Sequence, residues 1–240
     1  MTLPLVMVHG FMGGSAQWDG AISTIAQQRD VIALDLPGFG KNASLPVLDR
    51  IGSFADWVIE ELQNRGVARY NLLGHSMGGM IAQEIALRDG PRVEKLVLYA
   101  TGSIGVLPGR FETIAVSKER ARHYGAVATA RRISATWFLD YDRAHQYAAC
   151  AAVAECASQS AIQAGLSAME HWDGRDNLAR IACPTLILWG DQDRTYTWDQ
   201  IHLLWRTIPN TNLAVVPNAA HALHAEQPDL FQQVINAFLA

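Results

Sequence analysis

A single serine hydroxyl stands among closely spaced glycines in the run Gly74-His75-Ser76-Met77-Gly78. The pattern G-x-S-x-G lets a backbone turn sharply between a strand and a helix, which exposes the serine side chain. A hydroxyl is a weak nucleophile, so it needs a base that takes its proton and an acid that orients the base. The run predicts nucleophilic catalysis by Ser76; the competing interpretation is a serine that only shapes a turn.

Candidates for the base and the acid follow two later apolar runs, in "WGDQDRTY" and "NAAHALHAEQP". The acid candidates are Asp191 and Asp193, and the base candidates are His221 and His224. Aspartate readily bonds nearby backbone amides, so one of the two aspartates is expected to shape the turn. The two histidines could suggest a metal, but no carboxylate or third histidine stands at a ligand spacing nearby, so we expect no metal.

Attack on a carbonyl produces an oxyanion, which needs hydrogen-bond donors where the charge develops. The N–H of Met77 would begin the helix after the serine, and the helix dipole adds positive potential there. The run HGFMGG at residues 9–14 follows the first apolar run, and its glycines let the backbone approach a substrate. We therefore expect the backbone amides of Phe11 and Met77 to form an oxyanion hole.

Six short apolar runs alternate along the chain with helical patterns. They lie at residues 3–10, 30–38, 69–76, 93–102, 184–190 and 211–218. Near-continuous apolar character favours parallel strands that are covered on both faces, and Phe54, Val58 and Leu62 recur at a helical spacing between two of the runs. The alternation predicts an α/β fold with a doubly wound, mostly parallel sheet, in which ligands bind at the carboxyl ends of the strands.

One interval, residues 103–180, contains no convincing strand and reads as several alanine-rich helices. It is too long for a plain crossover between two strands. We therefore expect an α/β core formed by residues 1–102 and 181–240, with residues 103–180 inserted as a helical lid. The predicted substrate-pocket residues are His75, Trp137, Phe138 and Trp172.

The early part of this interval is basic, with Lys118, Arg120, Arg122, Arg131 and Arg132. A solvated helix face is the first interpretation. The second interpretation is that these basic side chains face inward and select a carboxylate- or phosphate-bearing substrate.

The bulk composition is that of an ordinary globular protein: 240 residues, half of them hydrophobic, with a formal net charge of −4. The net charge shows no excess of basic residues that would favour nucleic-acid binding, and no apolar run is long enough to cross a bilayer. The N-terminus lacks signal-peptide features, and three cysteines without paired spacing fit a reducing compartment, so a cytoplasmic location is expected. We expect no cofactor, and a monomer or homodimer.

In five motifs, and across essentially its whole length, the chain resembles the α/β-hydrolase superfamily. The motifs are HGFMGG, DLPGFGKN, GHSMGG, GDQD and the pattern H-x-x-x-x-E-x-P from His221 to Pro228. The resemblance implies Ser76 as nucleophile, His221 as base, and Asp193, three residues after the loop glycine, as acid. The antiparallel hairpin that commonly opens the family's sheet is expected to be reduced or absent, which would leave residues 30–38 at an edge.

The resemblance points to the small serine esterases that hydrolyse acyl methyl esters. We expect hydrolysis of carboxylic esters with small neutral or aromatic acyl groups, up to roughly eight carbons, since each buried methylene adds about 0.8 kcal/mol. The alternatives are a lactonase, a hydrolase of carbon–carbon bonds in ring-fission products, and a non-catalytic ligand receptor. His75 and Ala222 differ from the residues that ring-fission hydrolases typically carry at these positions.

Overall fold

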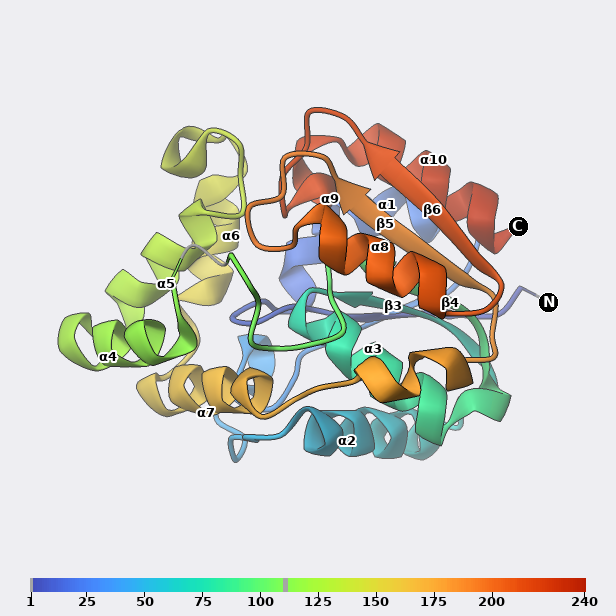
Figure 1. The fold of residues 1–240 in the computed structure, drawn as a ribbon, viewed down its shortest axis with the longest axis horizontal. Coiled ribbons are helices and arrows are strands. Elements are labelled where there is room, and N and C mark those ends of the chain that lie inside the picture. The colour runs from blue at the N-terminus through green and yellow to red at the C-terminus, as the bar shows by residue number, and fades with distance from the viewer. Residues whose placement is uncertain (1, 110–111) are drawn as a thin grey trace.

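The computed structural model describes residues 2–109 and 112–240. Its described strands form one sheet in the order β2-β1-β3-β4-β5-β6, and every neighbouring pair is parallel (Figure 1). The strands are β1 (Leu5–Val8), β2 (Val31–Leu34), β3 (Tyr70–His75), β4 (Val93–Tyr99), β5 (Thr185–Gly190) and β6 (Thr211–Val216). All six predicted runs are therefore strands, and no antiparallel hairpin joins the sheet within the described residues.

Alternate strand residues pack into two separate hydrophobic clusters, one on each face of the sheet. In β1, Leu5 and Met7 belong to one cluster, and Val6 and Val8 belong to the other. The first face is covered by α1 (Asp19–Ile25) and α10 (Pro228–Leu239). The second is covered by α2 (Ile51–Asn64), α3 (Met77–Arg88) and α8 (Trp198–Thr207). Helices on both faces confirm the predicted doubly wound fold.

Within residues 103–180, the part from Ile114 to Glu170 lies beyond the carboxyl ends of the strands, to the left in Figure 1. Their helices are α4 (Ile114–Tyr124), α5 (Ala126–Ala135), α6 (Tyr147–Ala154) and α7 (Gln159–Glu170), with 3-10 turns at Tyr141–Arg143 and Arg175–Arg180. In the described part of this interval the only strand-like pairing is an isolated bridge between Ile104 and Asp173. Residues 110 and 111 of the predicted lid lie outside the described residues. We call residues 103–180 the helical segment.

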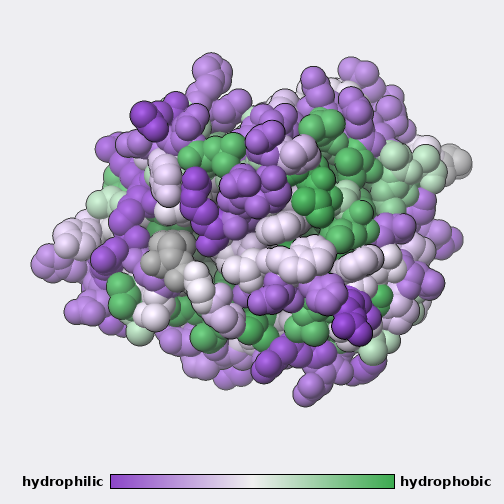
Figure 2. All heavy atoms as spheres, turned by 45° about the horizontal axis from the view of Figure 1, so that its top comes forward, coloured by the Kyte–Doolittle hydropathy of each residue, from purple (hydrophilic) through white to green (hydrophobic). Residues whose placement is uncertain are grey.

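The two edges of the sheet differ in exposure. β2, the edge predicted at residues 30–38, is part-buried along its length, whereas β6 has two exposed positions. Val215 on β6 is 45% exposed, and Trp198 and Trp205 on α8 are 43% and 41% exposed. Figure 2 shows hydrophobic patches that interrupt a largely hydrophilic surface. No helix among the described residues is long and apolar enough to span a bilayer.

Candidate active site

Ser76 occupies a strained turn between the end of β3 and the start of α3. Its backbone has φ 55° and ψ −119°, a conformation that costs about 1–3 kcal/mol in a residue with a side chain. A Cβ on Gly78 would lie 2.3 Å from the Val8 carbonyl oxygen, and one on Gly74 would lie 2.2 Å from the Gly78 oxygen. The Thr101 hydroxyl donates to the Ser76 carbonyl at 2.7 Å. The two glycines thus permit the close packing that holds the turn.

A buried hydrogen bond joins His221 to Asp193. The loops after β5 and β6 bring His221 Nδ1 and Asp193 Oδ2 to 3.0 Å, with both side chains almost fully buried. The other carboxylate oxygen of Asp193 accepts from the backbone N–H of Thr195 at 2.7 Å and of Tyr196 at 3.3 Å. Because Oδ1 is held by these amides, Oδ2 is fixed in the direction of the imidazole.

The two rival candidates lie in other contacts. Asp191 Oδ1 accepts from the backbone N–H of Ala219 at 3.4 Å, which braces the loop after β6. His224 is buried, and its Nδ1 lies 2.9 Å from the Tyr99 hydroxyl. The geometry therefore pairs Asp193, and not Asp191, with His221. Asp191 was expected to bond amides of its own turn, but it contacts a different loop, and the nearby amides of Thr195 and Tyr196 bond Asp193 instead.

The expected oxyanion donors flank Ser76. Met77 is the first residue of α3, and the first amides of a helix have no intrahelical acceptor. Phe11 follows β1, which pairs directly with β3 so that Val8 faces Gly74 across the sheet. Phe11 also lines the cavity at Ser76. Their places in the chain suit the predicted role, which stays a prediction.

Three buried histidines surround the site and are uncharged at pH 7. Burial lowers the pKa of His9 to about 4 and that of His224 to about 3. Burial also lowers the pKa of His75 well below its usual value, and the nearby His221 adds to that shift. His75 Nε2 donates to the His221 carbonyl at 3.1 Å, and the two rings lie 4.6 Å apart. His75 therefore helps to hold the backbone of His221 in place.

These histidines predict loss of stability in mild acid. Their folded pKa values lie below the unfolded value of about 6.5, so between pH 6.5 and pH 4 the unfolded chain binds protons that the folded chain does not. The contribution of these histidines to the free energy of unfolding should be nearly constant above pH 7 and should fall as the pH drops, by at most about 4 kcal/mol per pH unit for three histidines. Urea unfolding at pH 7.5, 6 and 5 measures this slope. An exposed control, His171→Gln, should leave the slope unchanged, and a pH-independent midpoint would contradict the prediction.

A small cavity of about 40 Å³ lies at Ser76. On this scale a single water needs about 10–15 Å³, so the cavity holds a few water-sized groups. It is lined by Gly10, Phe11, Gln17, His75, Ser76, Gly105, Leu107, Ile133, Trp137, Met169, Thr195, Tyr196 and His221. Apolar side chains from the loop after β1, from α5 and from α7 thus face the polar groups of Ser76 and His221 across the cavity.

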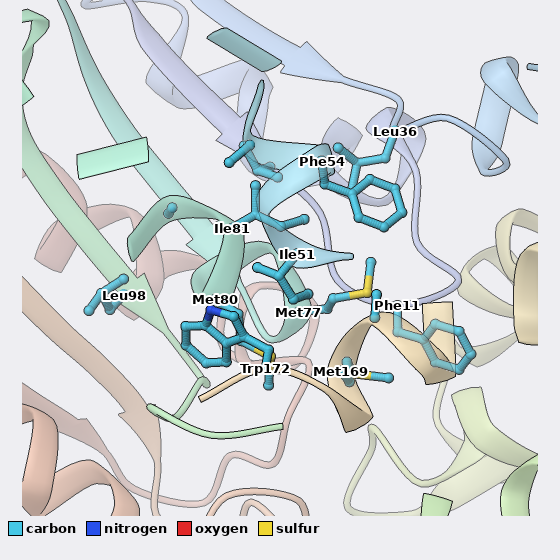
Figure 3. Packing of buried hydrophobic residues seen from close by; sticks show 14 of the residues in the cluster. Phe11, Leu36, Ile51, Phe54, Met77, Met80, Ile81, Leu98, Met169 and Trp172 are labelled. Carbon is cyan, nitrogen blue, oxygen red and sulfur yellow. The ribbon is translucent and has the colours of Figure 1, made fainter. Parts of the chain in front are cut away.

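Two of the four predicted pocket residues line this cavity and two do not. His75 and Trp137 are in the lining, and the Trp137 ring lies 6.5 Å from that of His221. Phe138 instead packs with Cys150 and Ala222 in a separate buried cluster. The prediction for Trp172 is also corrected, because its indole lies in the core near Met80 (Figure 3) and its Nε1 donates to Glu84 at 2.9 Å. A buried indole needs an acceptor, and Glu84 on α3 supplies it away from the cavity.

Some lining residues were not singled out from sequence, among them Gln17, Ile133, Met169 and Tyr196. Tyr196 is three residues after Asp193, and its hydroxyl lies 3.5 Å from Ser76 Oγ. Its position just after the acid was the one available signal. Nothing local indicates that its side chain returns to the nucleophile.

Two charged side chains, Arg194 after β5 and Glu226 after β6, tie the helical segment to the regions that carry Asp193 and His221. Arg194 donates to the carbonyls of Phe138 and Leu139 at 2.7 and 3.0 Å. Glu226 accepts from the backbone N–H of Leu139 at 2.6 Å with one oxygen and from that of Ala220 at 2.6 Å with the other. A backbone bond adds to them, from Ala222 N–H to the carbonyl of Trp137 at 2.9 Å. We call these contacts the tether.

The basic run of the helical segment is largely paired with glutamates. Lys118 contacts Glu170 at 2.5 Å, and Arg131 contacts Glu155 at 2.6 Å. Arg120 and Arg132 share Glu112, at 3.0 and 2.8 Å. None of the five basic residues lines the cavity at Ser76. The geometry therefore favours the first interpretation, a charged outer surface.

Within residues 2–109 and 112–240, no group of three or more metal-ligating side chains comes together. The cavity at Ser76 brings together a serine, a buried histidine–aspartate pair and nearby backbone amides. This set can take a proton from a nucleophile, stabilise an oxyanion and return the proton to a leaving group.

Comparisons with known proteins place the chain in a family. The α/β-hydrolase fold family matches residues 4–228. The chain is 26% identical over 243 residues to the pimeloyl-(acyl-carrier protein) methyl ester esterase of Aeromonas hydrophila, covering 98% of this chain and 94% of that protein. A thermophilic esterase from Thermogutta terrifontis has a TM-score of 0.89 and 27% identity, over 100% of this chain and 90% of its own. The enol-lactonase of Burkholderia xenovorans LB400 has a TM-score of 0.90 at 23% identity, over 100% and 92%, a likeness in fold alone. The chain belongs to the α/β-hydrolase fold family and is a hydrolase of that superfamily.

Proposed function

We propose that the protein is a serine esterase that cleaves carboxylic esters of small neutral acyl groups through an acyl-enzyme on Ser76; the aromatic acyl groups that were also expected are larger than the cavity of about 40 Å³. The main support is the buried hydrogen bond between His221 and Asp193, at the same cavity as a serine in a strained turn. A methyl ester esterase among the relatives is consistent with this reaction class. The helical segment, in this proposal, is the lid that closes the cavity.

In the proposed reaction, His221 takes and returns a proton once during acylation of Ser76 and once during hydrolysis of the acyl-enzyme. Ser76 Oγ attacks the ester carbonyl while His221 Nε2 takes its proton, and Asp193 Oδ2 accepts the Nδ1–H bond that fixes the tautomer. The backbone amides of Phe11 and Met77 bind the oxyanion. The C–O bond then breaks, and His221 returns the proton to the departing alcohol. Water repeats the sequence on the acyl-enzyme and releases the acid.

Turnover with time and labelling by a fluorophosphonate test this proposal. We expect steady release of p-nitrophenol from p-nitrophenyl acetate and covalent labelling of the wild-type protein. Saturable ligand binding without turnover of any ester would identify a receptor. Hydrolysis of lactones or of ring-fission diketones at a much higher kcat/KM than of any open-chain ester would identify one of the other two alternatives.

The cavity predicts a preference for the short end of the acyl series. A volume of about 40 Å³ accepts an acetyl or propanoyl group, whereas a longer chain must displace packed side chains, which typically costs about 1–3 kcal/mol. Among p-nitrophenyl esters, kcat/KM should be highest between acetate and butanoate and should fall about tenfold or more at octanoate.

A matched variant checks the cause of this length dependence. Ile133 is a buried lining residue on α5, and Ile133→Ala should move the optimum to longer acyl groups by enlarging the cavity. A kcat/KM that rises steadily to octanoate in the wild type would contradict the prediction. The paired basic residues also lead us to expect no preference for a carboxylate-bearing ester over a neutral one of equal size.

A further inference from the structure

Resting on the proposed function, we propose that the Tyr196 hydroxyl is a further catalytic group, which donates a hydrogen bond to the oxygen of the leaving alcohol. In the step concerned, the C–O bond of the tetrahedral intermediate breaks and its electron pair goes to the alcohol oxygen. His221 Nε2 supplies the proton. Tyr196 keeps its own proton and stabilises the developing charge through the hydrogen bond.

The first argument is distance. The Tyr196 hydroxyl lies 3.5 Å from Ser76 Oγ, and both groups line the same small cavity. This separation is longer than the length of about 2.7–2.8 Å that is usual for an O–H···O bond, and it places the two oxygens side by side in the cavity. When Ser76 Oγ has bonded to the carbonyl carbon, the leaving oxygen is attached to that same carbon, two bonds from Oγ. The hydroxyl is therefore within reach of an atom that arrives only with the substrate.

The second argument is the side from which Tyr196 approaches. In the sheet order, β1 lies on one side of β3, and β5 and β6 lie on the other. The expected oxyanion donor Phe11 comes from the β1 side, whereas Tyr196 and His221 come from the loops after β5 and β6. The Tyr196 ring stacks on the His221 ring with centroids 5.8 Å apart and an interplanar angle of 19°. Tyr196 thus shares a side with the group that must protonate the leaving oxygen.

The third argument is that the phenol is held in place before substrate binds. Its backbone N–H donates to Asp193 Oδ1 at 3.3 Å, and its carbonyl accepts from Trp189 Nε1 at 3.0 Å. The ring packs against Gly102, where an added Cβ would lie 3.2 Å from two ring carbons. The side chain is 1% exposed. A donor fixed in this way needs no reorganisation during the reaction, which is the condition under which such donors are most effective.

Leaving-group dependence tests the proposal. Tyr196→Phe removes the hydroxyl and keeps the ring. The kcat/KM of wild type and variant is measured for acetate esters of p-nitrophenol, phenol, trifluoroethanol and methanol. A good leaving group needs little help, so the loss should be a few-fold at most for p-nitrophenyl acetate and should grow to about 10²-fold for methyl acetate, as for other lost donors.

The control is Tyr70→Phe, which removes a buried hydroxyl bonded to Asp89 at 2.7 Å, at the opposite end of β3 from Ser76. It should lower the melting temperature without any dependence on the leaving group. An equal loss for all four esters in Tyr196→Phe, or no loss, would overturn the proposal while the esterase function stands. Absence of turnover of every ester by the wild-type protein would overturn both together.

Discussion

Replacing Ser76 with alanine is expected to lower kcat for ester hydrolysis by about 10⁶-fold, the usual effect of removing the nucleophile from a triad. The Oγ atom is removed, while the Cβ that occupies the strained turn is kept. The melting temperature should therefore remain that of the wild type. Progress curves with p-nitrophenyl acetate, together with fluorophosphonate labelling, measure the loss.

Two further variants sharpen this result. Ser76→Gly should be as inactive as Ser76→Ala but more stable by about 1 kcal/mol or more, because glycine adopts a positive φ without strain. Ser134→Ala, at another buried serine on α5, should retain both activity and labelling. Labelling of Ser76→Ala at the wild-type rate would mean that another residue is the nucleophile.

Replacing Asp193 with asparagine should lower kcat about 10⁴-fold with the fold intact. The amides of Thr195 and Tyr196 hold one oxygen of the side chain, so an asparagine would keep its oxygen there and direct its NH₂ group at His221 Nδ1. His221 Nδ1 would then have to accept a hydrogen bond from this NH₂ group, so the imidazole proton would sit on Nε2. A histidine protonated at Nε2 cannot take the serine proton.

Asp191→Asn is the matched control for this variant. Asp191 is exposed, and the one described hydrogen bond of its side chain is the 3.4 Å bond from Ala219 N–H, so the loss of the carboxylate should change kcat by a few-fold at most. The two variants are compared by kcat and by melting temperature. A slower enzyme from Asp191→Asn at an unchanged melting temperature would show that the acid has been misplaced.

The features that could be predicted from sequence are those fixed by local spacing. Gly74 and Gly78 bracket Ser76 within one turn, and the strand before and helix after it follow from short apolar patterns. Asp193 and His221 directly follow strands, and parallel strands end at the same edge of a sheet. Such motifs come together once the topology is known, and so the histidine–aspartate pair was expected.

The features that could not be predicted depend on packing between distant segments. Trp137 and Phe138 are adjacent in the chain, yet the first lines the cavity and the second lies in a separate cluster. Trp172 was expected in the pocket because it is aromatic, but a glutamate on α3 determines where its indole points. The direction of the Tyr196 side chain likewise depends on the Gly102 and His221 that it packs against.

The tether determines which positions of the helical segment can change as related sequences diverge. In the helical segment, the tether uses only backbone groups of residues 137–139. The side chains that it requires, Arg194 and Glu226, lie after β5 and β6. Position 137 can therefore exchange its side chain without releasing the anchor that keeps His221 in register. Because Trp137 lines the cavity, substitutions at this one position can reshape the pocket while the His221–Asp193 pair keeps its place.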